Sequence, residues 1–406
     1  MSAAAVRRPL AATLPGKAFA VSFFGRVLPA ALLGLAFASG SPARAAIREG
    51  FSEAVLADSL NSPVSMAIAP DGRVFVCEQG GRLRVVKNGR LLAKPFLVVP
   101  AYVNLEEGLL GVAFDPAFAW NRRVYLLYTY GSPARHNVVI RCEASGDTAE
   151  AKSIRTIFEL DPHLQHQHVG GGIHFGRDGM LYIGTGDNDH GEWSQSLHNS
   201  FGKILRIRSD GRLPSDNPFY KIATGRNRAI WARGLRNAFS FDIDGRTGRM
   251  FINDVGGSEV EEVNDGVAGA NYGWPVFEGP GHGEGFRSPV HHYGHDQGCA
   301  ITGGVFYSPR DAMFPPEWRG RYFFAEYCKN EIRWLDPAAP DSAEVFGVTR
   351  VPGPVDLRVG PDGALYYLVR GNSNPVGGDD TSRGMVVRVA WDGGAAGSGP
   401  RNAGHR

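Results

Sequence analysis

Short apolar segments of strand-like composition dominate the chain, and six times two such segments are joined by a tight turn. These turns are of the Pro-Asp-Gly or Asp-Pro kind, and the backbone preferences of Gly, Asp and Pro suit a reversal between antiparallel strands. Helical periodicity is almost absent, so we expect an all-β protein. The six copies of the pattern span residues 66–76, 111–128, 173–183, 239–252, 304–324 and 357–367.

The spacing of these copies predicts the architecture. Successive copies lie about 45 to 65 residues apart, which is room for a four-stranded sheet and a loop. Sheets repeated around an axis protect their edges in a β-propeller, so we predict a six-bladed β-propeller over residues 46–391. The alternative, a β-sandwich, gives no reason for the same turn chemistry to recur six times.

The loops at one end of a propeller converge on its axis, and we expect the functional residues there. Unusual polar or glycine-rich composition marks five connections between strands. These are residues 104–111, 165–172, 233–237, 254–274 and 356–358.

Residues 1–45 differ from the rest and predict a signal peptide. Basic residues precede an uncharged stretch at 27–40, and Ala43-Arg44-Ala45 offers the small-x-small pattern of a cleavage site. A membrane anchor is disfavoured because the apolar run of about 14 residues is shorter than the roughly 20 that cross a bilayer. Arg7-Arg8 leaves twin-arginine export open. We therefore expect a periplasmic or secreted protein with no membrane span in the mature chain, and a flexible tail at 392–406.

Charge and cysteine content narrow the possible partners. The formal net charge is +2 and the basic residues are scattered, so we expect no nucleic-acid partner. Export allows the four cysteines to pair, whereas the absence of C-x-x-C argues against a cysteine metal site. Three pairings are possible in principle. We expect a disulfide between Cys299 and Cys328, in neighbouring strand-like segments, and secondarily one between Cys77 and Cys142.

His168 is the candidate general base. Imidazole titrates near neutrality and can take a proton from an alcohol. The glycines at 170–172 remove side chains that would crowd a ligand. A structural role is the alternative, and a metal cluster with His163, His166 and His174 is another, although their spacing is not a familiar zinc pattern.

Two further segments have the composition of a ligand site. Arg236 with Asn237 suits carboxylates or quinone oxygens, because a guanidinium donates paired hydrogen bonds and an amide both donates and accepts. Residues 254–264 and 271–275 are rich in oxygen donors and glycine carbonyls, which suits calcium. A surface ion pair and a solvated acidic turn are the respective alternatives.

Together these motifs resemble the pyrroloquinoline quinone (PQQ) dependent soluble sugar dehydrogenases, the glucose/sorbosone dehydrogenase family of six-bladed propellers. The resemblance covers essentially the whole mature chain and rests on the order of several motifs. They are EGLLGVAF at 107–114, His168 with its glycines and the following Gly186-Asp187, GKILRI at 202–207, GLRN at 234–237, EEVN at 261–264 with NYGWP at 271–275, and TGG at 302–304.

The resemblance implies roles for individual residues toward the cofactor. His168 falls at the base that takes the proton of the sugar's anomeric hydroxyl, and Arg236 at the arginine that polarises the quinone oxygen, with Asn237 beside it. Glu106 matches a polar cofactor contact. Arg358 lies near an arginine that pairs with a cofactor carboxylate.

The resemblance also implies a calcium site and shows two departures. Gly256 and Gly257 match the carbonyls that hold the calcium bridging to the cofactor, while Glu262 and Tyr272 match calcium ligands of the same region. The acidic neighbour of the base is Gln167 here. The family's cofactor-clamping lysine falls on Cys328 or Lys329, and we assign it to Lys329.

The resulting hypothesis is a PQQ- and Ca²⁺-dependent enzyme that oxidises an aldose-type sugar at its anomeric carbon and passes the electrons to an unknown acceptor. We expect a monomer or homodimer. The main alternative is a non-enzymatic calcium-binding propeller that recognises a glycan or a protein. A calcium-dependent lactonase is a third reading, disfavoured because those propellers lack Arg236-Asn237 beside the histidine loop.

Overall fold

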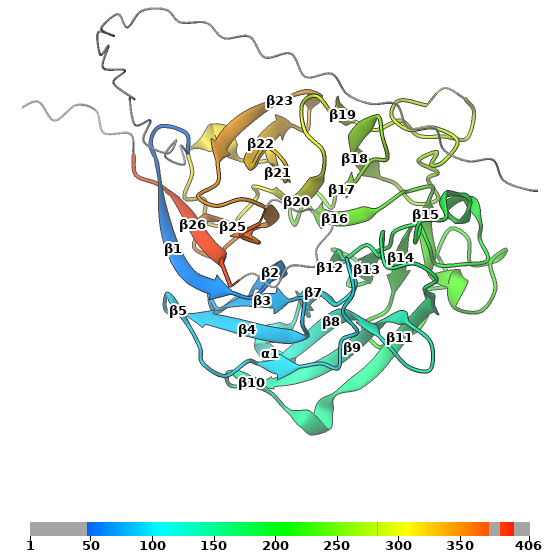
Figure 1. The fold of residues 1–406 in the computed structure, drawn as a ribbon, viewed down its shortest axis with the longest axis horizontal. Coiled ribbons are helices and arrows are strands. Elements are labelled where there is room, and N and C mark those ends of the chain that lie inside the picture. The colour runs from blue at the N-terminus through cyan, green and yellow to red at the C-terminus, as the bar shows by residue number, and fades with distance from the viewer. Residues whose placement is uncertain (1–46, 282, 373–381, 394–406) are drawn as a thin grey trace, which may run out of the picture. The chain divides into compact units, whose positions relative to one another are not determined.

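The structure is a computed structural model that describes residues 47–281, 283–372 and 382–393. The expected signal peptide and the tail from residue 394 onward lie outside these described residues. The described part folds into six antiparallel sheets, and the first strands of the sheets contact one another in a closed cycle. The predicted six-bladed β-propeller is therefore confirmed (Figure 1).

Each of the six predicted hairpins is the inner strand pair of one blade. The first three blades are β2 (Pro63–Ile68), β3 (Val74–Glu78), β4 (Arg82–Lys87) and β5 (Arg90–Leu91), with β6 (Leu97–Val98) also on β4; β7 (Leu109–Phe114), β8 (Arg123–Tyr130), β9 (His136–Ser145) and β10 (Thr148–Ala149), with β11 (Arg155–Pro162) also on β9; and β12 (Ile173–Phe175), β13 (Leu181–Gly184), β14 (Lys203–Ile207) and β15 (Ile230–Arg233).

The remaining blades follow the same plan. They are β16 (Ala238–Ile243), β17 (Met250–Asp254), β18 (Val260–Gly266) and β19 (His291–Gly294); β20 (Ile301–Phe306), β21 (Tyr322–Glu326), β22 (Glu331–Asp336) and β23 (Ala339–Val348); and β24 (Pro354–Val359), β25 (Leu365–Val369), β26 (Gly384–Trp391) and β1 (Phe51–Leu60). Helices in the described residues are α1 (Phe118–Asn121) and the 3-10 turns η1 (Ala151–Ser153), η2 (Gly191–Gln195), η3 (Gly225–Ala229) and η4 (Pro316–Trp318).

The sixth blade takes strands from both ends of the chain. β1 pairs with β26, so the first described strand forms the edge of the sheet to which the last described strand belongs (Figure 1). Phe51 of β1 packs edge-to-face against Phe314, Phe346 and Trp391, which come from blades 5 and 6. This pairing and its aromatic cluster close the ring.

The second strands of the blades explain the long apolar runs in the sequence. β3, β17, β21 and β25 are buried at every position. A blade is covered on both faces by its neighbours, so its central strands cannot alternate apolar and polar residues as a half-exposed strand does. The core consequently lies between blades.

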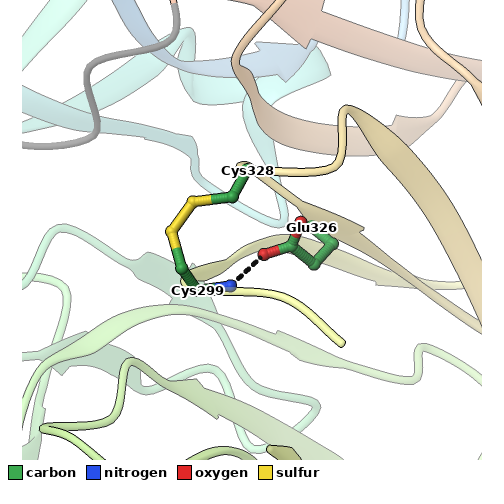
Figure 2. Close-up of side chains that lie close together, drawn as sticks. All are labelled: Cys299, Glu326 and Cys328. Carbon is green, nitrogen blue, oxygen red and sulfur yellow. Dashed lines mark hydrogen bonds between the residues drawn. A yellow bond between two sulfur atoms is a disulfide. The ribbon is translucent and has the colours of Figure 1, made fainter. Parts of the chain in front are cut away.

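The disulfide Cys299–Cys328 is present, as the sequence predicts, with 5.7 Å between the Cα atoms. It ties the segment before β20 to the turn after β21. The buried carboxylate of Glu326 reinforces this link by accepting a hydrogen bond from the backbone N–H of Cys299 at 2.6 Å (Figure 2). It also accepts one from the backbone N–H of Ala300 at 3.1 Å.

The second expected disulfide is wrong, because Cys77 and Cys142 are both free thiols. Cys77 lies on β3 of the first blade and Cys142 on β9 of the second, each packed among apolar side chains of one core cluster. A buried thiol behaves there as a small hydrophobic group. Burial raises the pKa of Cys142 to about 12, which disfavours the reactive thiolate.

Replacing Phe51 by alanine should weaken ring closure. Loss of a buried phenyl group costs about 3 to 5 kcal/mol, and we expect the free energy of unfolding of Phe51→Ala to fall by that amount. Urea unfolding followed by circular dichroism measures it. Trp120, which is 90 % exposed, is the matched control, and Trp120→Ala should change stability by less than about 0.5 kcal/mol. Equal losses in both variants would contradict the assignment.

Thiol titration should reveal one disulfide. The folded protein should react slowly with a thiol reagent, because both free cysteines are fully buried. Unfolding without reductant should expose the two thiols of Cys77 and Cys142, and unfolding with reductant all four. No thiol after unfolding without reductant would mean that the second pair exists.

Candidate active site

A cavity of about 250 Å³ lies on the axis, at the end of the ring where the inner strands begin. All five connections predicted to converge there contribute to its wall. They supply Leu105, Glu106 and Leu110; Gln167, His168 and Gly170 to Gly172; Arg236 and Asn237; Val255 and Gly256; and Asp356 and Arg358. Residues far apart in sequence therefore meet in one site.

His168 is held in the cavity wall by a buried carboxylate. Its Nδ1 lies 2.7 Å from Oδ1 of Asp187. The other groups bonded to this carboxylate, Trp274 Nε1 at 2.8 Å and Asp189 N at 2.8 Å, are donors. A carboxylate that accepts from Nδ1–H leaves Nε2 as the unprotonated nitrogen of the neutral ring. This is the arrangement of an oriented general base.

Two glycines allow the histidine loop to approach the neighbouring strand. Gly170 has φ of +71°, and a Cβ there would lie 2.4 Å from the carbonyl oxygen of Gly184. A Cβ at Gly186 would lie 2.1 Å from the carbonyl oxygen of His168. A side chain at either position would force the histidine loop and the neighbouring strand to move apart.

Arg236 and Asn237 are positioned by the buried carboxylate of Asp254. It accepts hydrogen bonds from both of their backbone N–H groups, at 2.9 and 2.6 Å. The Arg236 guanidinium donates to the Val255 carbonyl at 3.1 Å. Burial, together with the neighbouring Glu262, raises the pKa of Asp254 well above its usual range. The backbone hydrogen bonds oppose that rise.

Asn237 also joins Glu106 to the histidine loop. Its Oδ1 accepts from Gly170 N at 3.2 Å, and its Nδ2 donates to Glu106 Oε2 at 3.3 Å. Burial raises the pKa of Glu106, while nearby His168 and hydrogen bonds from Val169 N and Asn237 limit the rise. The two residues thus form one polar corner beside the base.

The predicted calcium residues divide into two groups. Gly256 lines the cavity, and Gly257 follows it in a loop whose N–H groups bind the Glu278 carboxylate. Glu262 does not line the cavity; its oxygens accept from Asn264 Nδ2 and Gly279 N, and burial raises its pKa to about 7.

The Tyr272 hydroxyl also lies outside the cavity lining. It donates to Asp265 O at 2.8 Å and accepts from Val267 N at 3.1 Å. Its phenol oxygen is thereby committed to backbone groups, which leaves its carbonyl as the atom that a cation could use.

Arg358 forms the floor of the cavity. Its guanidinium donates to the Met66 and Leu357 carbonyls, pairs with Asp356 at 2.8 Å, and lies 3.3 Å from His174 Nε2. Most of its N–H groups therefore bind the protein itself. Arg358 also lines a second cavity, of about 750 Å³, whose wall contains His174 and the inner-hairpin turns.

Lys329 does not reach the cavity. It is exposed in the turn after β21, and only its backbone N–H is tied, to Glu326. A different cation, the buried Arg370 at the end of β25, lines the cavity and donates to Gln79 Oε1 at 2.5 Å. Sequence reasoning missed Arg370, which stands in no recognisable motif. Sequence reasoning also gave Asp187 no role, although the Gly186-Asp187 pair that follows the histidine motif could have indicated one.

The neighbouring histidines do not form a metal cluster with His168. His163 and His166 bind the buried Glu107, at 3.0 and 2.6 Å, and His174 lies at the floor. Within the described ranges, the only grouping of three His, Cys, Asp or Glu side chains close enough to share a metal is Cys299, Glu326 and Cys328, whose sulfurs are already bonded to each other.

Comparison with known proteins agrees with this geometry. The family model of the Glucose / Sorbosone dehydrogenases matches residues 60–376. The chain belongs to this family. Aldose sugar dehydrogenase YliI of Escherichia coli is 29 % identical over 356 residues, which cover 83 % of this chain and 92 % of that protein.

Two further relatives differ in what their names describe. The PQQ-bound aldose sugar dehydrogenase of Streptomyces coelicolor superposes with a TM-score of 0.68 at 28 % identity, covering 85 % of this chain and all of that one. Hedgehog-interacting protein of Mus musculus is 28 % identical over 214 residues, which cover 46 % of this chain and 30 % of that protein.

The described residues contain no helix long and apolar enough to cross a membrane.

Titration of Asp242, which lines the second cavity, should change the free energy of unfolding. Burial raises the pKa of Asp242 to about 6, while the Phe306 N–H bond and Arg358 oppose the rise. The folded protein therefore holds a proton between about pH 4 and 6 that the unfolded chain has lost, and the stability from that proton disappears as pH rises. Asp242→Asn keeps an acceptor for Phe306 N–H but does not titrate.

We expect the free energy of unfolding of the native protein, relative to Asp242→Asn, to fall by about 1 to 3 kcal/mol between pH 4 and 6. Chemical unfolding at several pH values measures this difference. The same substitution at exposed Asp311 is the matched control. A difference that is constant with pH would show that Asp242 is ionised throughout.

Proposed function

We propose that the protein is a PQQ- and calcium-dependent dehydrogenase that oxidises an aldose-type sugar at its anomeric carbon. The observation that carries the proposal is the convergence of the His168–Asp187 pair with Arg236, Asn237 and Gly256 on one axial cavity. The family membership and the PQQ-bound relative support the redox chemistry.

The cavity suits a flat anionic cofactor. Arg236 and Arg370 present guanidinium groups, and Asn237 presents an amide, which together match carboxylates and quinone oxygens. Apolar residues such as Val64, Leu110 and Val355 complete the wall, as a ring system requires. Arg370 takes the cationic place for which the sequence suggested Lys329.

The protein's own part in the reaction is acid–base and electrostatic. A bound quinone would supply the acceptor for the hydride of the substrate carbon. His168 Nε2 removes the proton of the substrate hydroxyl, and Asp187 holds the imidazole in the required tautomer and stabilises its protonated form. Arg236 and Asn237 orient the cofactor and polarise its oxygens.

Calcium would bind through carbonyls of Gly256 and Gly257, where the loop meets the cavity. Buried Glu262 supplies a carboxylate on the strand that follows this loop, and burial, together with the neighbouring Glu278 and Glu261, raises its pKa. The Tyr272 carbonyl completes this proposed set, which is rich in the oxygen ligands that calcium prefers.

A calcium-binding, non-enzymatic propeller is the second candidate. Two observations favour it: Lys329 lies away from the cavity, and one relative is named for an interaction with a protein. This candidate predicts calcium binding without PQQ binding, so calorimetric titration with each ligand distinguishes the two. Export, as the first 45 residues suggest, is compatible with both.

Reconstitution tests the proposed enzyme. Apoprotein supplied with PQQ and calcium should reduce a dye with at least one aldose from a panel. His168→Asn should lower kcat by about 100- to 10,000-fold, because general base catalysis contributes that much. The matched control is His292→Asn, on the exposed side of β19. Absence of a bound quinone spectrum and of activity with every sugar would contradict the proposal.

A further inference from the structure

Trp274 belongs to the NYGWP motif, from which only Tyr272 has been given a role so far. Hydrogen bonds hold the backbone of Trp274 at both its N–H and its carbonyl. Its N–H donates to the Gly234 carbonyl at 3.0 Å, and its carbonyl accepts from Gln195 Nε2 at 2.7 Å. Gln195 also exchanges two hydrogen bonds with Asn271, at 2.9 and 2.7 Å. The position of the indole is therefore set before any ligand binds.

The indole N–H donates to Asp187, the partner of the base. Trp274 Nε1 lies 2.8 Å from Oδ2 of Asp187, while Oδ1 of the same carboxylate lies 2.7 Å from His168 Nδ1. The two carboxylate oxygens are thus divided between the tryptophan and the histidine. The backbone N–H of Asp187 donates to the Arg236 carbonyl at 2.7 Å, which links the same strand end to the arginine loop.

The indole ring also supports Arg236 and the glycine loop. The Arg236 guanidinium carbon lies 5.6 Å from the ring centroid, within the range of a cation–π contact. A Cβ at Gly257 would lie 3.1 Å from the indole and 3.5 Å from Arg236 Nε. One side chain therefore touches the residue that orients the base, the arginine of the cofactor site and the proposed calcium loop.

From this geometry we infer that Trp274 is a positioning residue, which holds the Asp187–His168 pair and the Arg236 guanidinium in a fixed relation to each other. The inference rests on the proposed function for its meaning in catalysis. The contacts themselves exist without a cofactor.

The indole N–H should also moderate the base. A hydrogen bond to Oδ2 draws charge away from Oδ1, so Oδ1 accepts more weakly from His168 Nδ1–H than it would without that donor. Removing the indole N–H should strengthen the hydrogen bond between His168 and Asp187. Trp274→Phe removes the donor and keeps an aromatic face for Arg236, whereas Trp274→Leu removes both.

The test is proton NMR of the His168 Nδ1–H in apoprotein, with the signal assigned from its loss in His168→Asn. Trp274→Phe should move this signal downfield, because a stronger hydrogen bond to Asp187 deshields the proton. Trp193→Phe is the matched control. Trp193 stands in the adjacent loop, stacked on His190 and Phe201, and its substitution should leave the signal unchanged.

Calorimetric titration with PQQ tests the contact between the Trp274 ring and Arg236 separately from the hydrogen bond to Asp187. Trp274→Leu should weaken PQQ binding about 10-fold and Trp274→Phe less than 3-fold, because the phenyl ring retains part of the cation–π contact. An unchanged His168 Nδ1–H signal in Trp274→Phe overturns the inference. Failure of the native protein to bind PQQ overturns the proposed function instead, and the NMR signal in apoprotein still decides the role of Trp274.

Discussion

The pairing of β1 with β26 is the constraint on which the site depends. Each blade contributes only a few residues to the axial cavity, and none of them can form a site alone. The β1–β26 ladder completes the sixth blade and so brings β24 against β2 and closes the cycle of inner strands. Ring closure thereby fixes the distances between loops that lie up to about three hundred residues apart.

Buried carboxylates complete this arrangement at the cavity end. Asp356 accepts from Met66 N, Asp254 from Arg236 and Asn237 N, and Glu261 from Ile301 N, at 2.7, 2.9, 2.6 and 2.9 Å. Glu326 does the same for the segment before β20. In each case a buried acidic residue binds backbone N–H groups in or beside the first residues of an inner strand. A carboxylate that satisfies these N–H groups stabilises the local geometry.

The sequence predicted the fold well because each blade repeats a local signal. Turn residues and apolar runs identified the six inner hairpins, and the position of each hairpin in the ring followed from its order in the chain. The convergence of five connections followed from the same symmetry. The Cys299–Cys328 bond was predictable for a related reason, since both residues flank strands of one blade.

The predictions that depended on side-chain direction were less successful. Cys77 and Cys142 lie in one core cluster, but on strands of different blades, and sequence order could not show that they are unbonded. Lys329 lies in an exposed turn, two residues after Tyr327, which lines the cavity, and the motif alone did not show where its side chain points. Arg370 and the Trp274–Asp187 contact arise where separate loops meet, which no local pattern encodes.

The central claim is that one axial cavity binds one redox cofactor through residues of several blades. A crystal structure of the protein soaked with PQQ and calcium tests it most directly. The account predicts the quinone inside the axial cavity, with the imidazole of His168 facing its ring and the guanidinium of Arg236 at its oxygens. A cofactor bound elsewhere, or a cavity that stays closed to it at saturating concentration, would contradict the account.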